Sequence, residues 1–288
     1  MLKRGMICGG LIQILFGKNE LSFYFKILAN IMNLTKKYNI NNNNKTKKNT
    51  KQHFSKINIT SVNDIIKKKD SIKLTSLISQ YFTKEILPIV NKCKRPINSK
   101  YNDFVERSKG RFEILPSKKI LKQIFQILNS NKKFRILNEK IKNTIKHFWG
   151  DVTEELGILP LEPDTAEGKW HRDIFVKSKN DFDKNVFYIT QVIYLDDKAD
   201  TEFCVNSQNN SDNNDEKYKK KHVHSKKCSS IFFDGRTIHR GLENESDKVR
   251  YAIYISYYKK TYIDNESLID KNFNEKDLLS VCNQSYKE

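Results

Sequence analysis

The chain has 288 residues, enough for one large domain with its own hydrophobic core. It carries 53 Lys and Arg residues against 34 Asp and Glu, a formal net charge of +19. Because the excess is mostly Lys, is scattered, and comes with many Asn residues, we interpret it as compositional bias and expect no specific nucleic-acid partner. The five Cys residues show neither C-x-x-C pairs nor a disulfide framework, which favours a reducing compartment.

The first 56 residues form a segment of their own. Two basic residues precede an apolar stretch over 5–17, and Glu20 is the only acidic residue before Asp64. This composition resembles a two-part organelle-targeting leader, and a disordered Asn-rich extension of a cytosolic protein is an equal alternative. The compartment therefore stays open between the cytoplasm and a plastid-like or mitochondrial organelle. The apolar run is shorter than the roughly 20 residues of a membrane span, so we expect no span.

Helical patterns dominate the first part of the folded region. A capping-box-like sequence at 61–64 predicts the start of a first helix. Apolar residues then recur at helical spacing over 120–128 and over 137–149, and Gly150 marks the end of the second segment. These segments predict a group of N-terminal helices.

Strand patterns follow from residue 151. The helical period disappears there, Pro160 and Pro163 interrupt the segment, and short runs rich in β-branched and aromatic residues continue to residue 262. Helices followed by strands indicate an α+β or mainly β domain over 57–262, with a β core over 151–262 that the helices buttress.

Two polar segments interrupt or follow this core. Residues 206–227 are rich in Asn, Asp, Ser and Lys, and we expect a disordered insertion. This insertion contains His222 and His224, with Cys228 close behind, a set that also fits a metal cluster. A solvated Lys-rich loop offers nothing to orient such ligands, so we favour the loop. The tail 263–288 has a short apolar periodicity that indicates a helix packed on the core.

The stretch over 230–258 carries the clearest local pattern. Two β-prone runs flank a polar loop, and Asp234 with Gly235 forms a strong turn signal in the first run. Interpreted as a hairpin symmetric about its loop, this stretch places His239 directly opposite Arg250. An always-charged Arg in an apolar hairpin is costly unless it meets an anion, and a bound carboxylate would satisfy it.

A second polar pair lies upstream, within an apolar run over 170–176 that reads as a strand. Strand alternation puts His171 and Asp173 on one face. With His239 from a later strand, they make the sequence pattern of the 2-His-1-carboxylate triad that holds non-haem Fe(II) and leaves coordination positions open. H-x-D alone is a weak motif, commonly a surface His near an Asp. The distal His, and Arg250 eleven residues beyond it, make the combination more specific.

Four sequence segments, WHRD, YITQVIYLDD, SIFFDGRTIHRG and VRYAIYISYY, together resemble the phytanoyl-CoA dioxygenase-like branch of the Fe(II)- and 2-oxoglutarate-dependent oxygenases. The resemblance covers residues 170–258, and GRFEILP at 110–116 is a weaker echo of a segment found in some members. It implies a double-stranded β-helix fold, that is, a jelly-roll or cupin-like core.

The resemblance also implies roles for individual residues. The catalytic iron ligands it implies are His171, Asp173 and His239. Arg250 would anchor the far carboxylate of 2-oxoglutarate. The strand over 186–195 would line the cosubstrate pocket, so Tyr188 and Gln191 are candidates for polar contacts with the cosubstrate. Strand parity allows only one of these two to point inward.

The implied reaction is the oxidative decarboxylation of 2-oxoglutarate by O2, which yields succinate and CO2 while a small-molecule or lipid-like substrate is hydroxylated. We expect Fe(II) and 2-oxoglutarate as cofactor and cosubstrate, and a monomer. One alternative is a hydroxylase of proteins or peptides, such as a prolyl hydroxylase, which the resemblance disfavours because the anchor is Arg and not Lys. Another is a non-enzymatic basic binding protein, which the complete set of site residues disfavours.

Overall fold

A computed structural model describes residues 59–92, 104–174 and 188–259. The leader 1–56 and the tail 263–288, with the predictions made for them, lie outside these residues. From Ser61 onward the chain belongs to one compact unit.

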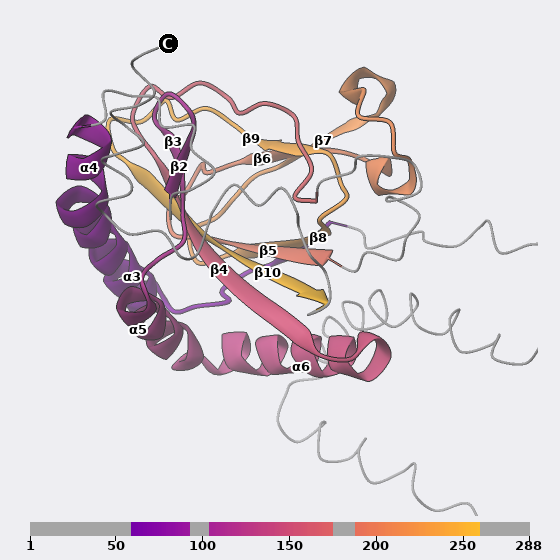
Figure 1. The fold of residues 1–288 in the computed structure, drawn as a ribbon, viewed down its shortest axis with the longest axis horizontal. Coiled ribbons are helices and arrows are strands. Elements are labelled where there is room, and N and C mark those ends of the chain that lie inside the picture. The colour runs from indigo at the N-terminus through magenta and orange to yellow at the C-terminus, as the bar shows by residue number, and fades with distance from the viewer. Residues whose placement is uncertain (1–58, 93–103, 175–187, 260–288) are drawn as a thin grey trace, which may run out of the picture. The chain divides into compact units, whose positions relative to one another are not determined.

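The larger layer is a seven-stranded sheet in the order β1-β8-β5-β10-β4-β3-β2 (Figure 1). Its central strands pair in antiparallel fashion, β10 lying between β4 and β5. The strands of this sheet are β1 (Thr60–Val62), β2 (Phe104–Ser108), β3 (Arg111–Ile114), β4 (Val152–Leu161), β5 (Tyr188–Tyr194), β8 (Ser230–Asp234) and β10 (Arg250–Lys259).

A three-stranded sheet in the order β7-β6-β9 forms the smaller layer. Its strands are β6 (Thr201–Cys204), β7 (Lys220–Val223) and β9 (His239–Gly241). The chain passes repeatedly between the two sheets, because β5, β8 and β10 belong to the larger one while β6, β7 and β9 belong to the smaller. Antiparallel strands that alternate in this way make a double-stranded β-helix, or jelly roll, and the predicted fold class is confirmed.

Helices cover the outer face of the larger sheet (Figure 1). They are α3 (Lys68–Tyr81), the π-helical turn η1 (Phe82–Ile86), α4 (Leu87–Lys92), α5 (Lys118–Asn129) and α6 (Lys132–Trp149). The two later segments match the predicted helices, because Ile124 and Leu128 of α5 and Ile141 and Ile145 of α6 are buried at helical spacing and α6 ends at Gly150, whose φ is 82°. None of the helices in the described ranges has the length and apolar character needed to cross a membrane.

The predicted start of the first helix is wrong. Residues 61–64 end strand β1 and enter a turn in which Asp64 has a φ of 52°, and α3 begins only at Lys68. The residue that precedes α3, Lys67, is held from elsewhere in the sequence, since its amide donates to Oδ1 of Asn131 at 2.8 Å. A local capping pattern cannot reveal a contact with a residue between two other helices.

The predicted hairpin between β9 and β10 is also wrong. These strands belong to different sheets, so His239 and Arg250 are not cross-strand partners. The polar loop over 242–249 crosses from one sheet to the other. Buried Asn244 holds this crossing in place by donating its side-chain amide to the Leu161 carbonyl at 2.9 Å.

The segment 206–227 is ordered, contrary to the expected disordered insertion. It contains the short helices η2 (Ser207–Asn209) and η3 (Asp215–Lys217), and its strand β7 pairs with β6. Arg172 binds the backbone of this segment. Its guanidinium donates to the carbonyls of Asn210 at 2.8 Å and Asp212 at 2.9 Å. Composition alone cannot show that a distant Arg satisfies these backbone groups.

Arg172→Ala is therefore expected to lower the free energy of unfolding by about 1 to 3 kcal/mol, because several carbonyls lose a charged donor. Urea denaturation followed by circular dichroism measures the change. Arg135→Ala, at an exposed position on α6, is the matched control and should change the free energy by less than about 0.5 kcal/mol. Equal stability of the two variants would show that segment 206–227 does not depend on Arg172.

Candidate active site

A cavity of about 450 Å³ lies between the two sheets, as its lining residues come from strands of both. Alternate residues of two central strands face it, as strand parity requires. These are Tyr188, Thr190, Val192 and Tyr194 of β5, and Arg250, Ala252, Tyr254 and Ser256 of β10.

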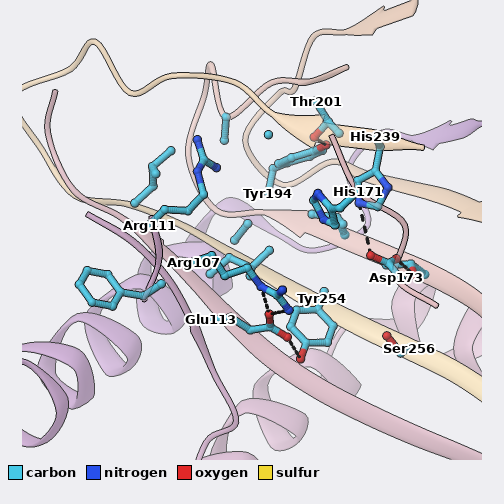
Figure 2. A pocket seen from close by; sticks show the side chains of 18 of the residues that line it. Arg107, Arg111, Glu113, His171, Asp173, Tyr194, Thr201, His239, Tyr254 and Ser256 are labelled. Carbon is cyan, nitrogen blue, oxygen red and sulfur yellow. Dashed lines mark hydrogen bonds and ion pairs between the residues drawn. The ribbon is translucent and has the colours of Figure 1, made fainter. Parts of the chain in front are cut away.

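His171, Asp173 and His239 come together on one wall of this cavity (Figure 2). One ligand atom from each residue lies within 4.8 Å of the others, and Nε2 of His239 is 3.3 Å from Oδ1 of Asp173. Two ligand atoms at right angles, each about 2.1 Å from one ion, are about 3 Å apart. The spacing of the three side chains therefore fits a single metal ion.

Main-chain bonds place His171 and Asp173 without a regular strand, whereas His239 begins β9. The amide of His171 donates to the His239 carbonyl at 3.0 Å, and the amide of His239 donates back at 2.9 Å. A bend follows, after which the Asp173 amide donates to the Gly235 carbonyl at 2.9 Å. The predicted strand over 170–176 is thus wrong for its described part, 170–174, and the bend brings the carboxylate towards the histidines.

Hydrogen bonds orient each ligand. Nδ1 of His171 and Nδ1 of His239 each lie 2.9 Å from the carbonyl oxygen two residues earlier. A carbonyl only accepts, so each Nδ1 carries the proton and each Nε2 keeps a free lone pair. Oδ2 of Asp173 accepts from the Thr190 hydroxyl, which leaves Oδ1 open. Two imidazole nitrogens and one carboxylate oxygen are a ligand set suited to non-haem Fe(II).

The protonation state of His171 also suits a metal. Burial, followed by the proximity of His239, lowers the pKa of His171 to about 4. The ring sits deep in the protein but keeps solvent-accessible surface because it faces the cavity. The imidazole is therefore neutral at pH 7, which is the form that binds metal.

Arg250 lines the same cavity from the start of β10 and is 7% exposed. Its terminal nitrogens donate to the carbonyls of Lys198 and Glu243, its Nε is buried without an acceptor, and no carboxylate of the described residues forms an ion pair with it. Burial lowers its pKa. Asp200 and Asp196 offset this burial only in part, and a buried guanidinium without an ion-pair partner is costly, so this site is suited to an anionic ligand.

The two candidate cosubstrate contacts on β5 lie on opposite faces. Tyr188 faces the cavity and stacks on the ring of Tyr258, with centroids 5.3 Å apart. Gln191 points to the helix-covered face, where it donates to the Ser230 hydroxyl at 3.1 Å and accepts from the Tyr257 hydroxyl at 3.1 Å. Gln191 lies outside the cavity, and the prediction of a cosubstrate contact is wrong for this residue.

Several cavity residues were missed from the sequence. Thr190 and Tyr194 share the face of Tyr188, and alternation along the strand would have identified both. The Tyr194 hydroxyl is 2.7 Å from Oγ1 of Thr201, which belongs to the smaller sheet. Arg111 of β3 also lines the cavity, and no local pattern marks it as a site residue.

A separate ion-paired group lies on another cavity wall (Figure 2). Arg107 pairs with Glu113, and the Tyr254 hydroxyl donates to the same carboxylate at 2.8 Å. Unlike Arg250, Arg107 therefore has a counter-charge within the protein.

The alternative metal cluster, predicted from His222, His224 and Cys228, has a different third member in the structure, Asp200. His222 and His224 lie 2.8 Å and 3.0 Å from the same carboxylate oxygen of Asp200, and Cys228 is not part of the group. Both histidines are exposed, and hydrogen bonds to Asp200 satisfy them.

The fold and the site together define a double-stranded β-helix protein with a 2-His-1-carboxylate cluster in its cavity. No family model matches the sequence, and no curated protein sequence matches it.

Solved structures of similar chain path include an epimerase, HygX and a prolyl hydroxylase. The epimerase SnoN, in complex with Fe3+, alpha-ketoglutarate and nogalamycin RO, has 12% identity and a TM-score of 0.49, over 70% of this chain and 79% of that one. HygX from Streptomyces hygroscopicus, with nickel and 2-oxoglutarate bound, has 9% identity and a TM-score of 0.49, over 72% and 84%. A prolyl hydroxylase from Trichoplax adhaerens, in complex with a hypoxia inducible factor peptide, has 11% identity and a TM-score of 0.46, over 70% and 84%.

Proposed function

We propose that this protein is an Fe(II)- and 2-oxoglutarate-dependent dioxygenase, of the phytanoyl-CoA dioxygenase-like type, that hydroxylates a small-molecule or lipid-like substrate and releases succinate and CO2. One observation carries this proposal: a single cavity contains both a convergent metal-ligand set and Arg250, a buried guanidinium without an ion-pair partner among the described residues. His171, Asp173 and His239 would hold the ion and leave coordination positions open for the 2-oxo acid and dioxygen.

Fe(II), when bound, supplies the redox chemistry that couples decarboxylation of the 2-oxo acid to hydroxylation of the substrate. The protein's own groups orient the ligand side chains and the 2-oxo acid. The Thr190 hydroxyl fixes the Asp173 carboxylate, and the carbonyls behind His171 and His239 fix both imidazole rings. Arg250 would orient the 2-oxo acid through its far carboxylate. Apolar lining side chains, Val192 among them, exclude water from the reacting atoms.

The size of the cavity supports a small substrate. Its volume of about 450 Å³ lies within the roughly 300 to 1,000 Å³ typical of small-molecule sites. Tyr188 remains a candidate polar contact within it. A peptide substrate is the alternative that the experiment below distinguishes.

Purified protein with Fe(II), 2-oxoglutarate and O2 is expected to form succinate, with the rate raised by a true substrate. The panel contains acyl-CoA thioesters, fatty acids and other small amphiphiles, and proline-containing peptides form a separate arm. His239→Ala is the inactive control. Stimulation by peptides alone would replace the small-molecule proposal, and iron-loaded protein that never consumes 2-oxoglutarate would contradict the reaction itself.

A further inference from the structure

Arg111 and Arg250 lie in one row across three strands of the larger sheet. Arg111 of β3 pairs with Leu161 of β4, and Arg250 of β10 pairs with the same Leu161 from the other side. Residues directly opposite one another point to the same face, and two strand spacings separate the two arginine backbones by about 10 Å. Both side chains therefore extend into the same cavity, which both of them line.

The crossing loop brings the two guanidinium groups to the same place. Nη2 of Arg111 donates to the Leu242 carbonyl at 3.0 Å and to the Ala166 carbonyl at 2.9 Å. Nη2 of Arg250 donates to the carbonyl of Glu243, the next residue along the loop. The two groups are close enough for the charge of Arg250 to lower the pKa of Arg111.

Neither arginine forms an ion pair with a carboxylate of the described residues, and the carboxylates that attract them, Asp200 foremost at Arg250 and Glu167 at Arg111, lie beyond ion-pair distance. Both Nε atoms are buried without an acceptor. Burial, followed by the charge of Arg250, lowers the pKa of Arg111 to about 10, so both groups stay protonated at neutral pH. Two like charges in a partly desolvated cavity repel one another, and an anion between them would remove the repulsion.

Three other arginines, in contrast to Arg111 and Arg250, form ion pairs with carboxylates. Arg107 is paired with Glu113, Arg236 with Asp234, and Arg240 with both Glu167 and Glu202. Of these pairs, Arg107 and Glu113 line the cavity. The row of Arg111 and Arg250 instead places two neighbouring arginines in the cavity with no ion-pair partner among the described residues, which indicates a ligand carboxylate.

Gly241 makes room for the Arg111 side chain. A Cβ atom added at Gly241 would lie 2.7 Å from Nη1 of Arg111, whereas one added at Gly168 would make an ordinary contact of 3.4 Å with its Nε. Any side chain at position 241 would therefore displace the guanidinium. Gly241 has no positive φ, so alanine there would act on Arg111 and not on the backbone.

We propose that Arg111 and Arg250 form one carboxylate subsite, in which Arg111 is a second positioning residue for the far carboxylate of the 2-oxo acid. This inference rests on the proposed function. A carboxylate has about four lone-pair directions and accepts from both guanidinium groups at once. Arg111 thereby sets the selectivity of the site for a 2-oxo diacid over a 2-oxo monoacid.

The test compares 2-oxoglutarate with 2-oxopentanoate, which has the same carbon chain without the far carboxylate. Anaerobic titration of the iron-loaded protein, followed by charge-transfer absorbance and by calorimetry, gives both affinities without turnover. Arg111→Gln is expected to weaken 2-oxoglutarate about 10- to 100-fold and to leave 2-oxopentanoate unchanged. Gly241→Ala should shift the selectivity in the same direction while every charge of the chain is retained.

Arg240→Gln is the matched control, because Arg240 is paired with carboxylates and does not line the cavity. Its selectivity should equal that of the unmodified protein.

Three results separate the possibilities. A loss of affinity for both acids alike in Arg111→Gln would assign Arg111 a structural role and overturn the inference. Unchanged 2-oxoglutarate affinity in Arg111→Gln, with a loss in Arg250→Ala, would overturn it and leave the proposed function intact. Iron-loaded protein that binds neither acid would overturn the proposed function itself.

Discussion

His239→Ala is expected to abolish Fe(II) binding without unfolding the protein. The imidazole is one of the three proposed ligands, and its loss leaves a single His and one carboxylate on the cavity wall. Even residues that only orient a ligand typically contribute 10- to 100-fold to metal affinity, so loss of a ligand should exceed about 100-fold. The fold should survive, because the ring is a single side chain packed against Phe203 and Phe233.

Co(II), used as a spectroscopic stand-in for Fe(II), measures this loss through its visible absorbance, and a melting curve on the same sample confirms the fold. His171→Ala should behave in the same way. His222→Ala is the matched control, since that histidine belongs to the exposed group around Asp200, and the cavity site should keep its absorbance. Unchanged metal binding in both His171→Ala and His239→Ala would remove the triad assignment.

Arg250→Ala is expected to weaken 2-oxoglutarate binding by about 2 to 4 kcal/mol, or roughly 30- to 1,000-fold, while the affinity for iron barely changes. The physical reason is that a charge-assisted and largely desolvated pair is broken. Arg250→Lys should recover only part of the loss, because a point charge cannot reproduce a two-pronged contact.

Anaerobic titration of the iron charge-transfer absorbance with 2-oxoglutarate, beside a melting curve, separates binding from stability. Arg250 also donates to the carbonyls of Lys198 and Glu243, so a modest fall in melting temperature should accompany the loss of affinity. A lowered melting temperature with an unshifted titration would mean that Arg250 is structural and does not anchor the cosubstrate.

Patterns that repeat over short distances were predictable. The helices over 120–128 and 137–149 follow from apolar residues at helical spacing, and Gly150 ends the second because a positive φ suits glycine. The turn at Asp234 and Gly235 is likewise local. Each of these features depends on a residue and its neighbours within about one or two turns of chain.

Pairings between distant segments were not predictable in the same way. His239 and Arg250 do not face one another, because the loop between their strands passes from one sheet to the other. Segment 206–227 donates and accepts at distant partners: its strand β7 pairs with β6, and its carbonyls accept from Arg172. In both cases the deciding contact joins residues that no local pattern connects.

The sequence by itself determined the chemistry: two histidines, one carboxylate and an arginine, in an order and spacing suited to an iron and 2-oxo acid site. Only the tertiary structure decided that Asp173 reaches the histidines through a bend, that Gln191 turns away from the cavity, and that Arg111 joins Arg250. The physical reason is that residue type and local spacing set which bonds a side chain can make. Strand pairing across the sheets sets which partner the side chain meets, and whether a buried charge is left without an ion pair.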